Sequence, residues 1–558
     1  MAKRTVVILG GALSGPTAAA RARETDEQAR IVLISKDARV AYAASGIPFH
    51  LSGEVKSVAA LDRERAEFFR DVYGIEVMTR TAVKSIDAVR KSIALEAEGK
   101  ASTLGYDALV FALGARMKPM SPKLEGTNVN SLRTLEELEA VQRTLSRVRG
   151  RKPRVTVIGG GIHGLAIVDG LVRRGAEVTL LERGAALLPQ FGPQVTRLAH
   201  EEIATRAKVH TGAEIILAHA EKGKVTRLGL SNGEEIACDF VVVTAGIAPR
   251  TELLAAAGAH LAPDGSVYVT ERAETSLPDI YACGICVSVP QLIGGAHTWN
   301  AQGAVADKVA QVAGANAAGG SAKLSPVAGT VLRRCLSLTL GRTGLSEAQA
   351  RAFVGANFDS TTIHAPSHDP YFPGSAPVLV QLFWDKSNGR LLGAEVAGKS
   401  GVDKRIDVCT AAIAGQLLVE TLATLDFGYA PPYGSQRDPI NVAATVAAAE
   451  RAGQFKGITV EELQARLGQV QVVDVREAKE SAKARVPGAL AIPLEQLRER
   501  KKELSPKGMV VSYCGDGRRG FLAARILSQS GFSDVRNLEG GLRSWQLMER
   551  TVEKGARK

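Results

Sequence analysis

TVVILGGALSG, residues 5–15, is the stretch that decides the fold of the first part of the chain. Its apolar run ends in glycines and leads into an alanine-rich segment that continues to Arg23. This pattern predicts a buried strand, a glycine turn and a helix whose unpaired N-terminal N–H groups face a pyrophosphate. A Cβ atom at Gly10 or Gly15 would block the turn or the close contact of helix and strand. We therefore expect a dinucleotide site whose phosphate side is formed by Gly10, Gly11, Ala12 and Gly15.

A second stretch of the same kind begins at residue 154, where RVTVI is followed by GGGIHG, residues 159–164. The segment AEVTLLE then ends at Glu182, about 20 residues on, where an acid can bond the ribose hydroxyls of a nicotinamide dinucleotide. A carboxylate there repels the 2′-phosphate of NADP, so the sequence favours NADH over NADPH. The predicted contacts of this site are Gly159, Gly161, Gly164 and Glu182.

The composition is that of a multidomain α/β protein. The chain has 558 residues, of which 45% are hydrophobic, and this length predicts roughly three to four domains. The first residues lack a signal-peptide pattern, and no run of about 20 apolar residues occurs, so we expect neither export nor a membrane span. Six cysteines in so long a chain favour free thiols in a reducing cytoplasm.

The net charge of +12 is spread along the chain and does not form the basic stripe typical of nucleic-acid binding. Dinucleotides and coenzyme A are polyanions that account for this charge at least as well. We expect no nucleic-acid partner and no metal site.

Near the C-terminus, VVSYCGDGRR, residues 510–519, carries a different chemistry. A predicted strand delivers Cys514 into a turn of backbone N–H groups, an arrangement that favours a thiolate or a persulfide, and two arginines add positive charge. With Glu539-Gly-Gly541 and Trp545, this segment resembles a rhodanese domain. The resemblance implies that Cys514 carries sulfur and that Arg519 is the arginine of its loop; the alternative is a buried structural cysteine.

The two glycine turns and the segment SGIPFHLSG, residues 45–53, resemble the coenzyme A disulfide reductases and related persulfide reductases. These are pyridine nucleotide-disulfide oxidoreductases, so the resemblance implies FAD at the first turn and NADH at the second. It also implies a homodimer, in which Tyr429 and Tyr433 of one subunit assist the partner's site; the alternative is that both are packing aromatics. The further cofactor contacts that it implies are Ser35, Lys36, Ala112, Gly114, Gly246, Gly284 and Ile285.

The order of these matches predicts two Rossmann-like dinucleotide-binding domains, an α+β dimerisation domain and an α/β rhodanese domain. The expected FAD-binding domain comprises residues 1–115 and returns at 250–325, with the NAD-binding domain at 116–249 between its two parts. The dimerisation domain is expected at 326–448, a linker at 449–456 and the rhodanese domain at 457–553.

Four positions depart from the family pattern. Ser45 stands where the family has its redox cysteine, and a hydroxyl has no S–S redox couple; the alternative is a turn residue that caps the next helix. Ser35 replaces an acid that bonds the adenosine ribose, Ala166 a glutamate, and Ile285 an aspartate that bonds the ribityl chain. FAD binding is expected to survive these losses, because each removes one contact among many.

Two further features keep alternatives open. Cys283 and Cys286 have the spacing of a redox dithiol, and they are also consistent with small core residues beside a tight turn. Arg21 and Arg23 match positions from which the family contacts coenzyme A, and they are also consistent with a solvated helix face.

The sequence therefore predicts an FAD-dependent NADH oxidoreductase acting on persulfide, polysulfide or coenzyme A disulfide substrates, joined to a sulfurtransferase module. The alternative function is a flavoprotein part that has lost its redox chemistry and serves as a scaffold for an active rhodanese domain.

Overall fold

The computed structural model describes residues 3–120 and 122–553. The chain forms two compact units, one comprising Met1–Ala186 and Ala204–Gly329, the other Leu187–Ile203 and Thr330–Lys558. Among the described residues, no helix combines the length and the apolar character that crossing a membrane requires.

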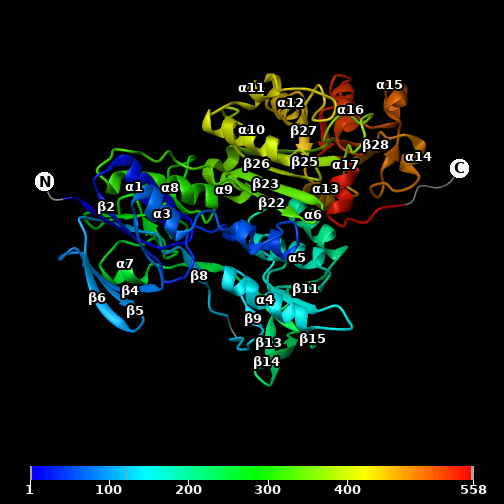
Figure 1. Cartoon of the computed structure of the whole chain (residues 1–558). Helices are drawn as coiled ribbons and strands as arrows, with labels where there is room; N and C mark the ends of the chain where they lie inside the picture. The colour runs from blue at the N-terminus through cyan, green and yellow to red at the C-terminus, as the bar shows by residue number, and fades with distance from the viewer. Residues whose placement is uncertain (1–2, 121, 554–558) are drawn as a thin grey trace. The chain divides into compact units, whose positions relative to one another are not determined.

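The first unit contains the parallel sheet that the opening stretch predicts. Its order is β19-β7-β1-β2-β3, formed by β1 (Thr5–Leu9), β2 (Arg30–Ile34), β3 (Glu76–Met78), β7 (Ala108–Phe111) and β19 (Ile280–Ala282). Residues 6–9, 31–34 and 108–111 of the three central strands are continuous apolar runs that are buried on both faces of the sheet. Helices α1 (Ser14–Thr25) and α8 (Gly303–Ala317) pack side by side (Figure 1), and Gly314 permits this contact because a Cβ there would lie 2.2 Å from the Ala18 carbonyl oxygen.

A second parallel sheet in the same unit has the order β12-β11-β10-β16-β9. It consists of β9 (Val129–Asn130), β10 (Arg154–Ile158), β11 (Glu177–Glu182), β12 (Lys208–Thr211) and β16 (Phe240–Val243), with α5 (Ile162–Arg173) after the glycine turn. The two sheets confirm the predicted pair of Rossmann-like folds.

Smaller elements complete the first unit. They are η1 (Ala44–Gly46), α2 (Ile47–Leu51), η2 (Val58–Leu61), α3 (Ala66–Tyr73), α4 (Leu135–Arg147), α7 (Glu252–Ala256), the three-stranded sheets β4 (Thr81–Asp87)-β5 (Ser92–Ala97)-β6 (Lys100–Gly105), β13 (Ile215–Glu221)-β14 (Lys224–Leu230)-β15 (Glu235–Ala237) and β18 (Val267–Tyr268)-β20 (Val287–Pro290)-β21 (His297–Trp299), and the pair β8 (Ala115–Met117)-β17 (Ile247–Pro249).

The second unit contains an antiparallel sheet of order β22-β23-β26-β25-β24. Arg405 is 1% exposed on α10 and binds Asp438, the residue before α12, at 2.9 Å, which ties the two helices together. The elements are β22 (Val331–Cys335), β23 (Leu338–Gly344), β24 (Phe358–Pro366), β25 (Pro377–Asp385), β26 (Leu391–Gly398), α6 (Pro193–Ala204), α9 (Glu347–Val354), η3 (Gly355–Asn357), α10 (Val402–Ala414), α11 (Val419–Thr424) and α12 (Pro439–Arg451).

A parallel sheet of order β27-β31-β30-β28-β29 forms the C-terminal part of this unit and confirms the α/β rhodanese fold. Trp545 is fully buried in its core. The elements are β27 (Lys456–Ile458), β28 (Gln471–Asp474), β29 (Leu490–Ala491), β30 (Met509–Tyr513), β31 (Asp534–Leu538), α13 (Val460–Arg466), α14 (Ala478–Ser481), η4 (Leu494–Gln496), α15 (Leu497–Arg500), η5 (Lys501–Glu503), α16 (Arg518–Ser528) and α17 (Gly541–Leu547).

Candidate functional site

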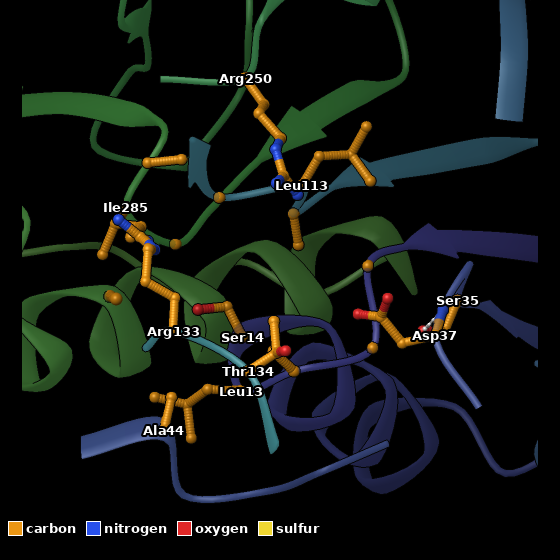
Figure 2. A pocket seen from close by; sticks show the side chains of 18 of the residues that line it. Leu13, Ser14, Ser35, Asp37, Ala44, Leu113, Arg133, Thr134, Arg250 and Ile285 are labelled. Atoms are coloured by element: carbon orange, nitrogen blue, oxygen red, sulfur yellow. Dashed lines mark hydrogen bonds between the residues drawn. The ribbon is translucent and has the colours of Figure 1, made fainter. Parts of the chain in front are cut away.

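A cavity of about 1090 Å³ lies over the glycine turn that follows β1 (Figure 2). It extends from the residues after β2 to the loop that carries Ser45, and it brings together residues far apart in the sequence. The residues predicted to contact FAD that line it are Gly10, Gly11, Ala12, Ser35, Lys36, Ala112, Gly114, Gly284 and Ile285.

The glycine turn has the close packing that the sequence predicts. Gly10 has φ +117°, and a Cβ there would lie 2.2 Å from the Ala112 carbonyl oxygen. A Cβ at Gly15 would lie 1.7 Å from the Gly10 carbonyl oxygen. Helix α1 begins at Ser14 with no acidic residue in its own first turn, and the partial positive charge of its N-terminus faces the cavity.

Ser45 is exposed in the cavity wall, on the short 3₁₀ turn Ala44–Gly46. Ser45 is thus a residue at the turn, as the alternative interpretation has it, but it does not cap the next helix, because α2 has Gly46 as its N-cap and no side-chain cap. Helix α2 packs against α5 of the second dinucleotide fold, where a Cβ at Gly170 would lie 2.7 Å from the Pro48 carbonyl oxygen. The loop of Ser45 is therefore held beside the nicotinamide-binding fold.

Cys283 and Cys286 are buried in the core of the first unit and are not among the residues that line the cavity. The Cys286 thiol donates to the Cys283 carbonyl oxygen at 3.1 Å. Burial raises the pKa of Cys286 to about 12 and that of Cys283 well above its usual value, so both stay protonated. This geometry favours the interpretation of the pair as core residues over a redox dithiol.

The second glycine turn holds its acid in place. Gly159 has φ +109°, and a Cβ at Gly164 would lie 1.9 Å from the Gly159 carbonyl oxygen. Glu182, at the end of β11, accepts hydrogen bonds from the backbone N–H groups of Gly160 and Gly184, both at 2.6 Å. The carboxylate therefore lies directly beside the turn at which a ribose would bind.

Cys514 follows β30 and is fully buried. Burial raises its pKa, and the nearby Asp516 carboxylate adds to this, since the thiol donates to Asp516 Oδ1 at 3.2 Å. The predicted N–H groups are present, and those of Asp516 and Gly520 lower the pKa, but burial outweighs them. The expectation that this loop favours a thiolate is thus corrected, because its closed form holds a neutral thiol.

Two contacts close the loop of Cys514. A Cβ at Gly541 would lie 2.4 Å from the Cys514 carbonyl oxygen, so the start of α17 covers the loop. Arg519 forms two hydrogen bonds with Glu480, at 2.7 and 2.8 Å. The arginine is therefore held by a carboxylate in this form of the loop.

The remaining predicted residues lie at the surface. Tyr429 and Tyr433 are 44% and 74% exposed, so neither is a core aromatic, and their action at a partner's site stays a prediction. Arg23 donates to the carbonyl oxygens of Tyr73 and Ala29, at 2.7 and 2.9 Å, and Arg21 pairs with Glu24 at 2.9 Å. Arg23 thus has a structural role, and coenzyme A binding by these arginines stays a prediction.

The sequence did not predict the charged residues that line the cavity besides Lys36, which are Asp37, Arg63, Arg116, Arg133, Glu137, Arg250 and Asp307. Asp37 lies two residues beyond Ser35, the position at which an acid is expected, and this proximity in the sequence could have identified Asp37 as a candidate. Arg133 precedes α4 and Arg250 follows β17, so only the tertiary fold brings them to the same wall.

Comparison with known families assigns three ranges of the chain. Residues 4–303 match the pyridine nucleotide-disulphide oxidoreductase family, residues 335–438 its dimerisation domain and residues 459–548 the rhodanese-like domain. An NADH oxidase of Methanocaldococcus jannaschii is 30% identical over 453 residues, which are 78% of this chain and 97% of the relative.

Two solved structures resemble nearly the whole chain. Reduced CoADR-RHD of Bacillus anthracis has a TM-score of 0.93 at 27% identity, covering 99% of this chain and 100% of its own. A NAD-dependent persulfide reductase from A. fulgidus has a TM-score of 0.89 at 32% identity, covering 97% of this chain and 100% of its own.

Proposed function

Since the chain belongs to the pyridine nucleotide-disulphide oxidoreductases, a family of enzymes, and carries a C-terminal rhodanese-like domain, we propose that it is an NADH-dependent flavoenzyme acting on sulfane sulfur. Its substrates would be persulfides, polysulfides or coenzyme A disulfides. The persulfide reductase from A. fulgidus and a CoA-dependent NAD(P)H sulfur oxidoreductase of Pyrococcus abyssi are named for activities of this kind, and we extend such an activity to this chain. We further propose a homodimer, because a dimerisation domain is present.

The observation that carries the proposal is the cavity that joins the first glycine turn to the Ser45 loop. Its volume of about 1090 Å³ suits a dinucleotide. Gly10 and Gly15 leave no space for a Cβ, so the turn stays tight and the N-terminus of α1 remains open to a diphosphate. An acid and two arginines in the wall provide partners for ribose and phosphate, so the residues present fit FAD.

FAD bound in this cavity would supply the hydride chemistry, taking electrons from NADH and giving them to the acceptor. The residues of the chain would orient NADH and the substrate relative to the flavin. Glu182 and the turn of Gly159 would hold the NADH ribose and diphosphate, and the packing of α2 on α5 would keep the Ser45 loop against the nicotinamide end.

Ser45 restricts which sulfur chemistry this site can perform. A serine cannot form a mixed disulfide, and the six cysteines of the chain are all buried. The sulfur that is reduced would therefore be carried by the substrate's own thiol, as in coenzyme A persulfide, or be reduced directly. The Ser45 hydroxyl would remain a hydrogen-bond partner for that substrate.

Cys514 would carry sulfane sulfur to or from this reaction. Cys514 is fully buried in the core of the rhodanese-like part, which implies that the loop opens before a substrate enters. Arg519 would then be available to the bound anion once it leaves Glu480.

A second candidate function is a scaffold that supports an active rhodanese domain. The exposed serine in the place of the redox cysteine favours it. The two functions differ in anaerobic turnover: with glutathione persulfide, the enzyme consumes NADH and releases sulfide in equal amounts. Thiosulfate:cyanide sulfur transfer without any persulfide-dependent NADH consumption would establish the scaffold instead.

A further inference from the structure

The two dinucleotide folds of the first unit differ at one equivalent position. In the second fold, Ile158 pairs with Leu181, and the next residue, Glu182, bonds the N–H of Gly160 in the glycine turn. In the first fold, Leu9 pairs with Ile34 in the same register, and the next residue is Ser35. A Cβ at Gly11 would lie 2.4 Å from the Ser35 hydroxyl, so this serine occupies the place of the acid. Its side chain is too short to reach a ribose beyond the turn.

Asp37 lies at the same end of the cavity. The Ser35 hydroxyl accepts the backbone N–H of Asp37 at 3.2 Å, which turns the chain so that Asp37 enters the cavity wall. Figure 2 shows its carboxylate beside Ser35, on the side of the glycine turn. Burial raises the pKa of Asp37, and the charged groups around it are Lys36, Glu136 and Arg250.

No group in the described part of the chain lies within hydrogen-bond distance of the Asp37 carboxylate oxygens. A partly buried carboxylate without such a partner is destabilised relative to water. A ribose with two hydroxyl donors would satisfy it.

Arg250 and Arg133 bring two positive charges to the cavity. The N–H of Arg250 bonds the Gly114 carbonyl oxygen at 2.9 Å, which fixes its backbone at the cavity rim. Burial lowers the pKa of Arg133, and the charge of Arg250 lowers it further. Neither guanidinium has a carboxylate partner at hydrogen-bond distance within residues 3–120 and 122–553. Two neighbouring cations without such a partner indicate a site for an anion.

The order of these groups along the cavity matches that of the parts of FAD. Figure 2 shows Asp37 at one end, Ile285 and Ala44 at the other, and Arg250 between them on the wall opposite Leu13 and the start of α1. Ribose, diphosphate and flavin follow one another in this sequence in FAD. The diphosphate would lie between the helix N-terminus and a guanidinium, which binds phosphate in a bidentate way.

We propose that Asp37 accepts the hydroxyls of the adenosine ribose of FAD and that Arg250 binds its diphosphate. Asp37 then makes the ribose contact that Ser35 does not make, and Arg250 adds a phosphate contact that offsets the ribityl contact that Ile285 does not make. The inference rests on the proposed function, since it takes FAD as the ligand of the first cavity.

The test is the dissociation constant of FAD from the full-length protein after the flavin has been removed, followed by quenching of flavin fluorescence. Asp37→Asn and Arg250→Gln are each expected to weaken FAD binding about 10-fold or more, as expected for a lost charge-assisted hydrogen bond. The matched controls Asp71→Asn and Arg39→Gln alter surface ion pairs outside the cavity, with Arg70 and Glu139, and should bind FAD like the native chain.

Two further readouts separate a ligand contact from a structural role. FMN lacks the adenosine ribose, so Asp37→Asn should leave FMN binding as it is in the native protein. Arg250→Gln should reduce the salt dependence of FAD binding, because one phosphate contact is removed.

FAD constants within twofold of the native value in either variant, or an equal loss of FMN and FAD binding in Asp37→Asn, would overturn the inference. A native chain that binds no FAD would contradict the proposed function. A native chain that binds FAD, with both variants binding it equally well, would contradict only the roles of Asp37 and Arg250.

Discussion

At the scale of single residues, Ser45 decides which sulfur chemistry the flavin site can perform. It is the exposed residue of the loop that α2 and α5 hold beside the cavity. A thiol in its place would meet the substrate from the same position and could form a mixed disulfide. We expect Ser45→Cys to gain NADH-dependent reduction of coenzyme A disulfide, measured anaerobically as NADH consumption.

The matched control is Ser146→Cys, which adds an exposed thiol on α4, away from the cavity lining. No gain in Ser45→Cys, or an equal gain in both variants, would show that the loop does not present residue 45 to the acceptor.

Burial and the Asp516 carboxylate both raise the pKa of the Cys514 thiol, and Asp516 is the one of the two causes that a single substitution can remove. Because the pKa is raised, the thiolate forms only as the pH rises. We expect the thiosulfate:cyanide rate to increase with pH, and the midpoint of this profile to move to lower pH in Asp516→Asn. An unshifted midpoint, with the loop still folded, would mean that the carboxylate does not act on the reacting thiol.

Cys514→Ser provides the companion measurement. It should abolish thiosulfate:cyanide transfer and leave NADH:dye reduction intact, because Cys514 belongs to the second unit. Retained transfer would refute the assignment of Cys514 as the sulfur carrier.

At the scale of elements, the first strand, turn and helix depend on the absence of a side chain at Gly15. A Cβ there would lie 1.7 Å from the Gly10 carbonyl oxygen, a contact that only a shift of the turn can relieve. We expect Gly15→Ala to lose FAD binding and to lower the midpoint of thermal unfolding by several degrees, corresponding to about 1–3 kcal/mol. Gly105→Ala is the control, since its Cβ would meet nothing closer than 3.9 Å. Native FAD affinity in Gly15→Ala would contradict the packing described for the turn.

The elements were predictable from the sequence where local pattern determines them. The apolar run and glycine spacing of residues 5–15 specify strand, turn and helix, because the steric reason for each glycine lies within the same fold. The glycines at 159 and 164 are explained in the same way. The family resemblance also identified the rhodanese fold around Cys514 correctly.

Properties that depend on distant contacts were not predictable. Burial raises the pKa of the Cys514 thiol because the side chain lies in a core with distant residues such as Phe455 and Leu497, and nothing in the loop's own sequence reveals that burial. Arg23 on α1 resembles a surface cation in the sequence, yet it donates a hydrogen bond to the carbonyl oxygen of Tyr73, the last residue of α3. Arg250 reaches the first cavity only through the pairing of β17 with β8.

At the scale of the whole molecule, a pair of buried carboxyl groups connects the two parts of the second unit. Glu450 at the end of α12 accepts the N–H of Gly457, and Glu539 accepts the N–H of Thr362 in β24 at 3.1 Å. A Cβ at Gly457 would lie 2.9 Å from an oxygen of each, so the two carboxyl groups flank the same point. Burial raises the pKa of Glu450 to about 8 and that of Glu539 well above its usual value.

This pair makes the stability of the second unit dependent on pH. A carboxyl group with a raised pKa in the folded state contributes its stability fully at acidic pH and loses it as the pH rises through the folded value. For Glu450 this loss extends from about 4.5 to about 8. We expect the thermal midpoint of the rhodanese part to fall over this range, and hydrogen exchange at β27 and β24 to increase.

Glu450→Gln should flatten this dependence, because the amide stays neutral at every pH. Glu495→Gln is the control, an exposed glutamate on η4 that should leave the dependence unchanged. A midpoint of the native protein that is constant from pH 5 to pH 8 would show that the two carboxyl groups do not titrate in this window.

The central claim is that one chain passes electrons from NADH to a flavin held over the glycine turn of residues 10–15. The most direct measurement is an anaerobic NADH titration of the full-length protein reconstituted with FAD, followed by the visible flavin absorbance. We expect one FAD per chain and complete bleaching by about one equivalent of NADH, faster than with NADPH. A protein that retains no FAD, or whose bound flavin stays oxidised in excess NADH, would contradict it.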